Sequence, residues 1–303
     1  MMINWEAVVK IYNELKTVET LPKFISIRMF ESSVEIAFED IGNKEAEVII
    51  RLKDKGSDLL NPLEDHFFDI ETKEGIDEQE LDILRFYLPF AFCGYFGRKN
   101  QKCFSISHFA QTLDGKIATS IGDSKWIGNE ENLVHAHRMR ALCDGIVVGA
   151  RTLERDNPKL NVRKVSGSDP IKIILGGNRL LDSEKYHALD SSTIVFQKSI
   201  DKSSKYDCVL MPETSVFDLS DILKILVKKG VYSIYIEGGS YTTSCFLEQR
   251  ALDQVQIHFS SKILGSGVTA FSFGNIQEIK ESINFQSVRF KPMGNEMMFL
   301  GNL

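Results

Sequence analysis

Residues 233–243 read Ser-Ile-Tyr-Ile-Glu-Gly-Gly-Ser-Tyr-Thr-Thr, an apolar run that leads through two glycines into a helical pattern. The β-branched and aromatic residues predict a buried strand, and Gly238 and Gly239 predict the turn that ends it. A helix that begins directly behind glycines presents free backbone N–H groups and the positive end of its dipole. This stretch therefore predicts a strand, a turn and a helix with an anion site at the helix N-terminus.

Apolar runs of the same character recur along the rest of the chain after residue 103. They lie at 104–110, 145–148, 171–175, 193–196, 208–210 and 255–259, and helical patterns lie at 129–142, 218–229 and 240–250. Such alternation predicts an α/β fold with a mostly parallel sheet and helices on both faces. Two last runs, at 284–291 and 296–300, predict an antiparallel edge. Folds of this class bind ligands at the carboxyl ends of their strands.

The first 100 residues have a different pattern of apolar and polar residues. Helical patterns lie at 4–16 and 77–92, and alternating runs lie between them at 24–29, 34–38 and 46–52. This part is acidic, whereas the remainder is mildly basic. We therefore expect a small α+β domain over 1–100 and a second domain over 101–303. Gly94 and Gly97 predict the boundary, and we expect the two parts to be separable near residues 97–102.

Composition excludes several classes of protein. The 303 residues are 43% hydrophobic and 26% charged, which excludes disordered and low-complexity chains. No apolar run reaches the roughly 20 residues of a membrane helix, and the first residues lack a secretory signal pattern. Five scattered cysteines without a C-x-x-C motif argue against a disulfide framework or zinc ribbon. We therefore expect a cytoplasmic protein that does not bind membranes. Its net charge is −6, and its acidic first part lacks the clustered Lys and Arg that nucleic-acid binding needs.

The first segment that could carry chemistry follows the run at 104–110. Asp114-Gly115 is a turn signal, and the side chains of Thr112 and Asp114 can hydrogen-bond to nearby backbone. A plain structural turn is one interpretation and a ligand-binding loop is the other. Ser124 and Trp126 follow. For Trp126, a position in the hydrophobic core and a position against a ligand both remain open.

The helical pattern at 129–142 contains His135 and His137. Two positions apart on a helix, these side chains point about 200° away from each other, so they cannot chelate one metal ion. Arg140 lies on the same stripe as His137 and Leu133, which should pack inward. A buried guanidinium needs an anion, and both a structural carboxylate and a ligand phosphate remain open.

Two further strand ends carry polar groups. The run at 145–148 leads into Gly149, where a small residue lets a ligand approach the backbone. Thr152 and Asp156 follow one helical turn apart and supply hydrogen-bonding groups. Glu237 stands beside the predicted anion site, where it either binds ligand hydroxyls or only caps the turn.

In order, these segments resemble one known family. They read Leu-Asp-Gly-Lys-Ile-Ala (113–118), Ser-x-Trp-Ile (124–127), His-x-x-Arg-x-Arg-Ala (135–141), Val-Gly-Ala-x-Thr-x-x-x-Asp-Asn-Pro-x-Leu-x-x-Arg (148–163), Glu-Gly-Gly (237–239) and Leu-Gly-x-Gly (264–267). The set resembles the reductase domain of RibD-type riboflavin-biosynthesis deaminase/reductases, which have a dihydrofolate-reductase-like fold. The resemblance covers about two thirds of the chain.

The resemblance implies an NADPH-dependent oxidoreductase of riboflavin biosynthesis. Its reaction would reduce a 5-phosphoribosylamino-pyrimidine from the ribosyl to the ribityl form, with hydride transfer to ribose C1′. The residues implied to bind the cofactor are Ala110, Trp126, Thr152, Asp156, Gly177, Gly238, Gly239, Ser240, Tyr241 and Thr242, with Arg179 for its 2′-phosphate. Those implied to bind the substrate are Ser124, Arg140, Leu160, Arg163 and Glu237, with Arg140 and Arg163 for its 5′-phosphate. Asp114 and Glu237 are the catalytic candidates, and no metal is implied.

The sequence also departs from that family. RibD proteins carry an N-terminal zinc deaminase with H-x-E and P-C-x-x-C motifs, and residues 1–100 contain neither. We therefore expect that the first domain is not a deaminase. Family members are commonly homodimers, and we expect the same here.

Two other functions remain open. The same fold and cofactor could serve a pterin or a secondary-metabolite precursor, although a pterin offers no 5′-phosphate to Arg140 and Arg163. Alternatively, the protein could be a non-catalytic nucleotide-binding regulator, which would bind NADPH without oxidising it.

Overall fold

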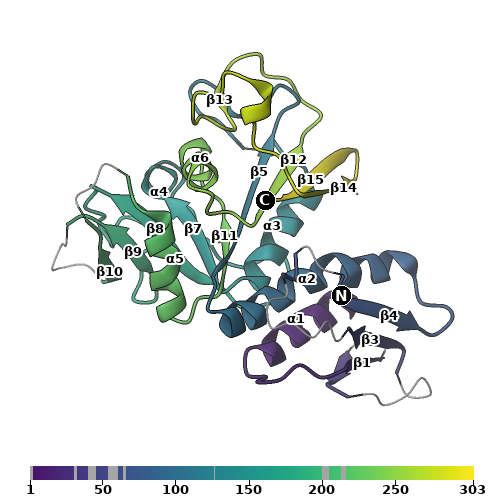
Figure 1. Ribbon diagram of the computed structural model, residues 1–303. Coiled ribbons are helices and arrows are strands. Elements are labelled where there is room, and N and C mark those ends of the chain that lie inside the picture. Colours follow the sequence, from purple (N-terminus) through teal and green to yellow (C-terminus); the bar gives the residue numbers. More distant parts are fainter. Residues whose placement is uncertain are drawn as a thin grey trace.

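In a computed structural model, the two parts of the chain are built on separate sheets (Figure 1). The structure describes residues 3–30, 33–39, 46–53, 61–63, 66–125, 127–199, 205–212 and 216–303. The N-terminal unit has a four-stranded sheet, and the larger unit has a nine-stranded sheet and a separate two-stranded one.

The N-terminal unit packs two helices on an antiparallel sheet. Its elements are α1 (Ile3–Leu15), β1 (Phe24–Met29), β2 (Val34–Ala37), β3 (Val48–Leu52), β4 (Phe68–Thr72) and α2 (Glu78–Asn100). The strand order is β2-β1-β3-β4. The sequence pattern does not predict β4, because this edge strand is largely exposed and carries little apolar signal.

The larger unit follows directly from α2. Its elements are β5 (Phe104–Gln111), β6 (Lys116–Ala118), α3 (Glu130–Leu142), β7 (Gly145–Gly149), α4 (Ala150–Asp156), β8 (Ile171–Gly177), β9 (Ile194–Gln197), β10 (Asp207–Leu210), α5 (Leu219–Lys228), β11 (Ser233–Ile236), α6 (Ser240–Glu248), β12 (Gln254–Phe259), β13 (Val268–Thr269), the 3-10 turn η1 (Ile279–Glu281), β14 (Ser287–Met293) and β15 (Glu296–Asn302).

The nine-stranded sheet has the order β10-β9-β8-β7-β11-β5-β12-β15-β14. The first seven strands in this order, from β10 through to β12, pair in parallel. Strand β15 pairs antiparallel with both β12 and β14, and β14 forms the edge of the sheet. Helices α2 and α3 cover the face on which Tyr235 lies, whereas α5 and α6 cover the opposite face with Ile234 and Ile236. The predicted fold class, a mostly parallel sheet with helices on both faces behind a small α+β unit, is confirmed.

Helix α2 is longer than the sequence predicts, because it continues through Gly94 and Gly97 to Asn100. A Cβ atom at Gly97 would lie 2.6 Å from the carbonyl oxygen of Tyr232, and one at Gly94 would lie 3.5 Å from the Asp144 carboxylate. Gly97 therefore allows close packing on the larger unit, a Cβ atom at Gly94 would make only ordinary contact, and neither glycine ends the helix. Although α2 has 23 residues, no helix in the described part of the chain is long and apolar enough to cross a membrane.

The two units share one hydrophobic core. A single cluster of buried side chains contains Trp5, Tyr87 and Phe90 from the N-terminal unit and Met139, Leu142 and Tyr235 from the larger one. Polar contacts cross the same boundary, since Tyr12 Oη donates to Asp144 Oδ1 at 3.1 Å. A cut near residues 97–102 would expose this core to water. The packing therefore disagrees with our expectation that the two parts are separable.

A buried chain of hydrogen bonds runs through the sheet face that α2 covers. Tyr87 Oη donates to His135 Nδ1 (3.0 Å), and His135 Nε2 donates to Gln256 Oε1 (2.8 Å). We assign the proton to Nε2 because an amide oxygen only accepts. Gln256 continues the chain to Gln254 (2.8 Å), which in turn reaches Asn302 (2.7 Å). The neutral form of His135 thus satisfies all its partners.

Acid should destabilise the fold through His135 and its neighbour His108, whose rings lie 5.2 Å apart. Burial lowers the pKa of His108 from 6.5 to about 4, and burial together with His108 lowers the pKa of His135 well below 6.5. The unfolded chain takes up protons first, so the stabilisation is complete above pH 6.5 and is lost as the pH falls toward 4. His108 alone accounts for about 3 kcal/mol.

Chemical denaturation between pH 7.5 and 4.5 measures this loss. His108→Gln should flatten the pH dependence of the unfolding free energy, whereas His187→Gln, at an exposed histidine, should leave it unchanged. Equal slopes for the wild type and His108→Gln would contradict the prediction.

Candidate active site

A cavity of about 510 Å³ lies at the carboxyl ends of the parallel strands β8, β7 and β11. Residues that follow these strands line one side of it. Ala118 and Val268, from the two-stranded β6–β13 sheet, line the other side. This small sheet belongs to a lobe that stands away from the main sheet (Figure 1). The cavity is therefore at the sheet edge where the sequence predicts ligand binding.

The cavity brings together many of the predicted site residues. Its lining includes Ser124, Thr152, Asp156, Gly177, Arg179, Gly239, Ser240, Tyr241 and Thr242. Ala110, near the end of β5, and Gly238, two residues after β11, do not line the cavity. Trp126 lies outside the described residues, so its role stays a prediction.

Glycines frame the helix that borders the cavity. Gly239 is the N-cap of α6, and no side chain caps this end of the helix. A Cβ atom at Gly149 would lie 2.6 Å from Thr242 Oγ1, and one at Gly238 would lie 2.5 Å from Thr242 Cβ. Larger residues would push α6 away from the strands. The glycines therefore hold the uncapped N–H groups of α6 against the cavity, as an anion site requires.

Arg140 and Glu237 form a buried, bidentate ion pair. Nε donates to Oε1 at 2.7 Å and Nη2 donates to Oε2 at 2.6 Å, while Nη1 donates to the carbonyl oxygen of Asn161 at 3.0 Å. Arg140 is only 9% exposed. The resemblance implies the substrate's 5′-phosphate as the partner of Arg140, whereas in the structure its guanidinium pairs with the Glu237 carboxylate.

The pair keeps Glu237 ionised. Burial by itself would raise the pKa of this carboxyl, but the Arg140 guanidinium outweighs burial and holds the pKa below its ordinary value of 4.5. Glu237 therefore acts as a hydrogen-bond acceptor near neutral pH and not as a proton donor.

The loop after α4 brings the other substrate candidates to the same place. The backbone N–H of Arg163 donates to His137 Nδ1 (3.2 Å), and Arg163 Nη1 donates to Asn161 Oδ1 (3.1 Å). Burial and the neighbouring Arg140 lower the pKa of His137 to about 4. Leu160 has a left-handed backbone (φ 53°) and a buried side chain, which fixes the loop. Arg163 itself keeps an exposed side chain.

Asp114 joins two turns of the lobe. Its carboxylate accepts from Thr112 Oγ1 (2.6 Å), Leu264 N (3.1 Å) and Gly265 N (2.7 Å). The bond from Thr112 and those from the backbone lower the pKa of Asp114 to about 2. These contacts give the carboxylate a positioning role, and they leave it ionised at neutral pH.

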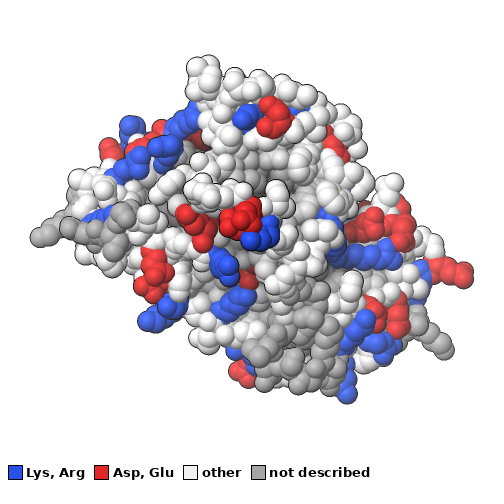
Figure 2. Space-filling view, turned by 45° about the horizontal axis from the view of Figure 1, so that its top comes forward, with Lys and Arg blue, Asp and Glu red and all other residues white. Residues whose placement is uncertain are grey.

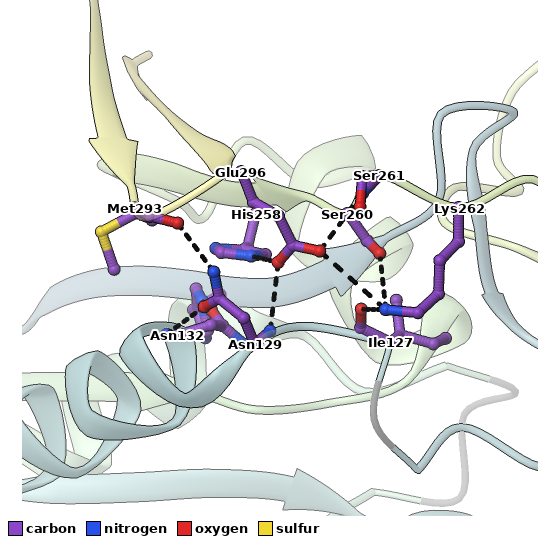
Figure 3. A network of polar contacts seen from close by, with 10 residues as sticks. Ile127, Asn129, Asn132, His258, Ser260, Ser261, Lys262, Met293 and Glu296 are labelled. Carbon is purple, nitrogen blue, oxygen red and sulfur yellow. Dashed lines mark hydrogen bonds and ion pairs between the residues drawn. The ribbon is translucent and has the colours of Figure 1, made fainter.

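Glu296 anchors the segment that leads into α3 (Figure 3). Its Oε2 atom lies 2.5 Å from His258 Nε2 and accepts from the backbone N–H of Asn129 at 3.1 Å. Lys262 Nζ donates to the carbonyl oxygen of Ile127 at 2.9 Å. Glu296 of β15 and Lys262 after β12 therefore hold residues 127–129 in place at the start of α3.

Several cationic residues of the cavity are not predicted from the sequence. Arg151, Arg155 and Lys198 all line it. Arg151 and Lys198 follow β7 and β9 by two residues and by one, and a position just after a strand is the signal that could have identified them. On the face in Figure 2, by contrast, described acidic and basic side chains are interspersed, without the broad basic surface that nucleic acid requires.

The family model described as the RibD C-terminal domain matches residues 104–299. The chain belongs to the RibD C-terminal domain family. The match begins with β5 and ends within β15, so it covers the nine-stranded sheet, the lobe and the cavity. The resemblance drawn from the sequence motifs is thereby confirmed.

Relatives within the RibD family are moderately similar. The riboflavin biosynthesis protein RibD of Aquifex aeolicus is 31% identical over 196 residues, which is 63% of this chain and 55% of that protein. The 2,5-diamino-6-ribosylamino-4(3H)-pyrimidinone 5′-phosphate reductase of Methanothermobacter thermautotrophicus is 28% identical over 205 residues, which is 64% of this chain and 94% of that protein. This chain thus spans little more than half of the Aquifex RibD.

A solved structure is similar over much of the RibD-family unit. The Thermotoga maritima diaminohydroxyphosphoribosylaminopyrimidine deaminase/5-amino-6-(5-phosphoribosylamino)uracil reductase superposes with a TM-score of 0.59 at 28% identity. The alignment covers 74% of this chain and 62% of that chain.

Proposed function

We propose that the protein is an NADPH-dependent reductase that converts the ribosyl group of a 5-phosphoribosylamino-pyrimidine to a ribityl group. The observation that carries this proposal is the adjacency of a cofactor-sized cavity and the Arg140–Glu237 pair, which meet at the end of β11. Membership of the family and the activity named for the Methanothermobacter relative support the same reaction.

The cavity fits a dinucleotide. Its volume lies within the range of small-molecule and cofactor sites, and the glycine-framed N-terminus of α6 suits a pyrophosphate. Thr152 and Asp156 offer hydrogen-bonding groups on α4, opposite α6. The bound cofactor would supply the hydride, and the protein supplies position and charge.

The polar cluster beside the cavity fits a phosphorylated sugar. The Glu237 carboxylate, held on both oxygens by Arg140, keeps further lone pairs with which to accept ribose hydroxyls. The exposed guanidinium of Arg163 suits the 5′-phosphate. Glu237 and Asp114 are both ionised at neutral pH, so each carboxylate accepts hydrogen bonds and orients the groups that donate to it. Neither donates the proton that opening of the sugar ring requires.

Turnover tests the proposal directly. Purified protein and NADPH are offered the aminated and the deaminated ribosylaminopyrimidine phosphates separately, and nicotinamide absorbance is followed. Oxidation of NADPH with either compound supports the reductase and shows whether it acts before or after deamination. Tight NADPH binding without turnover of either compound would overturn the proposed substrate.

Arg163→Ala should weaken substrate binding about 10- to 150-fold, because a hydrogen bond to a charged group is worth about 1.5–3 kcal/mol. The KM for the phosphorylated substrate should rise while NADPH binding stays the same. Lys164→Ala is the matched control, since this neighbouring exposed cation pairs with Glu130 at 2.8 Å. Unchanged KM and kcat in Arg163→Ala would remove this residue from the phosphate site.

We also propose that the protein forms a homodimer through the C-terminal edge of the large sheet. Val288 and Phe290 on β14 are 52% and 63% exposed, and Met297 on β15 is 38% exposed. Phe290 pairs with Phe299, and Pro292 pairs with Met297, so these apolar side chains share one face. An exposed apolar face at a sheet edge favours contact with another protein surface.

Phe290→Asp should convert the dimer to a monomer. Light scattering after gel filtration should give twice the chain mass of 34.3 kDa for the wild type and the single mass for the variant. Leu210→Asp, at an exposed leucine on the opposite edge strand β10, should stay dimeric. A monomeric wild type would contradict the proposal.

A further inference from the structure

Trp5, on the first helix of the chain, contacts the loop that carries the substrate candidates Leu160 and Arg163. Its indole Nε1 donates to the carbonyl oxygen of Ser166 at 3.0 Å, across 161 residues of sequence. The indole N–H can only donate, and Trp5 is 4% exposed, so this carbonyl supplies the acceptor that a buried tryptophan needs. One side chain of the N-terminal unit is therefore bonded directly to the backbone of this loop.

The same loop packs on the N-terminal unit at both sides of Arg163. Val162 and Val165 are partly buried against the hydrophobic cluster that contains Trp5 and Tyr87. Between them, the side chain of Arg163 stays exposed. The N-terminal unit thus supports the backbone from which the Arg163 guanidinium extends.

Trp5 and Tyr87 also enclose a cation of α3. The guanidinium carbon of Arg138 lies 5.3 Å from the centroid of the Trp5 ring and 5.1 Å from that of the Tyr87 ring. The two ring centroids are 5.5 Å apart and the ring planes meet at 77°, so the rings form a corner around the cation. A guanidinium within about 6 Å of an aromatic ring face is attracted to it, and more strongly where water is excluded. The N-terminal unit therefore holds α3 as well as the loop.

Helix α3 carries its two arginines on opposite sides. Helices α1 and α2 both contact α3 (Figure 1), and Arg138 faces them. Arg140 follows two positions later, so its side chain leaves the helix about 200° away and pairs with Glu237 beside the cavity. The aromatic corner around Arg138 therefore restrains the rotation of α3 about its axis, and with it the position of Arg140.

We propose that Trp5 is a positioning residue for substrate binding, and that through it the N-terminal unit holds α3 and the Arg163 loop in the geometry that receives the substrate. The inference rests on the proposed function, because it takes Arg140, Arg163 and Glu237 as the substrate side of the site. Among the described residues, the lining of the cavity includes none from α1, α3 or 157–170. Trp5 should therefore affect the substrate and not the dinucleotide.

Trp5→Phe in the full chain tests the positioning role, because phenylalanine keeps an aromatic ring beside Arg138 and removes the N–H group that donates to Ser166. The KM for the ribosylaminopyrimidine phosphate should rise about 2- to 12-fold, since the loop loses one hydrogen bond and the substrate must order it. Both kcat and the Kd of NADPH should stay within about twofold, because the contact serves the ground state and the transition state alike.

Tyr12→Phe is the matched control. Tyr12 is also a buried aromatic residue of α1 that donates across the boundary between the units, to Asp144 Oδ1 at 3.1 Å. Asp144 directly precedes β7, so this contact lies at the amino ends of the parallel strands, away from the cavity. Thermal unfolding measures the stability that each variant loses, and only Trp5→Phe should raise the KM.

A double-mutant cycle separates positioning from general destabilisation. In the Arg163→Ala background, Trp5→Phe should raise the KM much less than it does in the wild type, because the guanidinium that the loop positions is gone. Fully additive effects of the two substitutions, or an equal rise of the KM in Tyr12→Phe, would overturn the positioning role.

Hydrogen exchange tests the same contact without turnover. The backbone N–H of Arg163, which donates to His137 Nδ1 at 3.2 Å, should exchange about 2- to 12-fold faster in Trp5→Phe and at the wild-type rate in Tyr12→Phe. Unchanged exchange in Trp5→Phe would overturn the inference while the proposed reductase stands. A wild type that oxidises NADPH with neither ribosylaminopyrimidine phosphate overturns the proposed function, and exchange then still decides whether Trp5 holds the loop.

Discussion

Arg140→Ala should destabilise the protein by about 3–5 kcal/mol, because it leaves the buried Glu237 carboxylate without its cation. Both carboxylate oxygens of Glu237 accept from the guanidinium, and the side chains of Arg140 and Glu237 are only 10% and 18% exposed. The loss corresponds to a fall of roughly 10 °C in the melting temperature. Calorimetry or urea denaturation at pH 7.5 measures it.

The pH dependence identifies the cause of this loss. In the wild type the pKa of Glu237 is below 4.5, so its contribution to stability is present above that pH and is lost as the pH falls through the folded value. In Arg140→Ala, burial raises the pKa of Glu237 without its main opposing influence, the Arg140 guanidinium. The stability gap between variant and wild type should therefore narrow in acid. In the Arg140→Ala background, Glu237→Gln should restore part of the stability. If it does not, an unpaired Glu237 carboxylate is not the cause of the loss.

The fragment 101–303 should fail to fold into a soluble, cooperatively unfolding protein. Without the N-terminal unit, Met139, Leu142 and Tyr235 lose the aromatic side chains of α1 and α2 that cover them. Each buried apolar side chain of this size is worth about 1.5–3 kcal/mol, so the summed loss is comparable with the roughly 5–15 kcal/mol that stabilises a typical domain. Soluble yield and near-ultraviolet circular dichroism measure the effect.

Complementation provides the control. Fragment 1–100 expressed together with fragment 101–303 should recover soluble protein, because the two chains can rebuild the shared core. A soluble fragment 101–303 with a cooperative melting transition would show that the larger unit folds independently, as the change of sequence pattern near residue 100 predicts.

Most elements follow from local sequence patterns. The strands of the large sheet have their predicted places within a few residues, because short β-branched runs between glycines and charged turns leave little choice of structure. Helix α4 is missed because seven residues are too short for a periodic apolar signal. Helix α2 is predicted too short because glycine is taken as a helix breaker, whereas Gly97 is there for close packing.

The site was predicted in part. The motif at 237–242 leads to the glycine-framed end of α6, and Thr152, Asp156 and Gly177 reach the same cavity. Local sequence gives Lys198 only a position after a predicted strand, which is ordinary for a lysine until the neighbouring strand is known. It also leaves the partner of Arg140 undecided, since Glu237 lies 97 residues away.

By itself, the sequence determined the α/β class, the strand ends that carry polar residues and the family to which the chain belongs. These properties depend on side chains close together in the chain, where backbone preference and apolar periodicity act. Only the tertiary structure decided that Arg140 meets Glu237, that Arg179 and Lys198 line one cavity and that both units share one core. Those contacts depend on strand order and helix packing, because a sheet places residues side by side according to the position of their strands and not their separation in sequence.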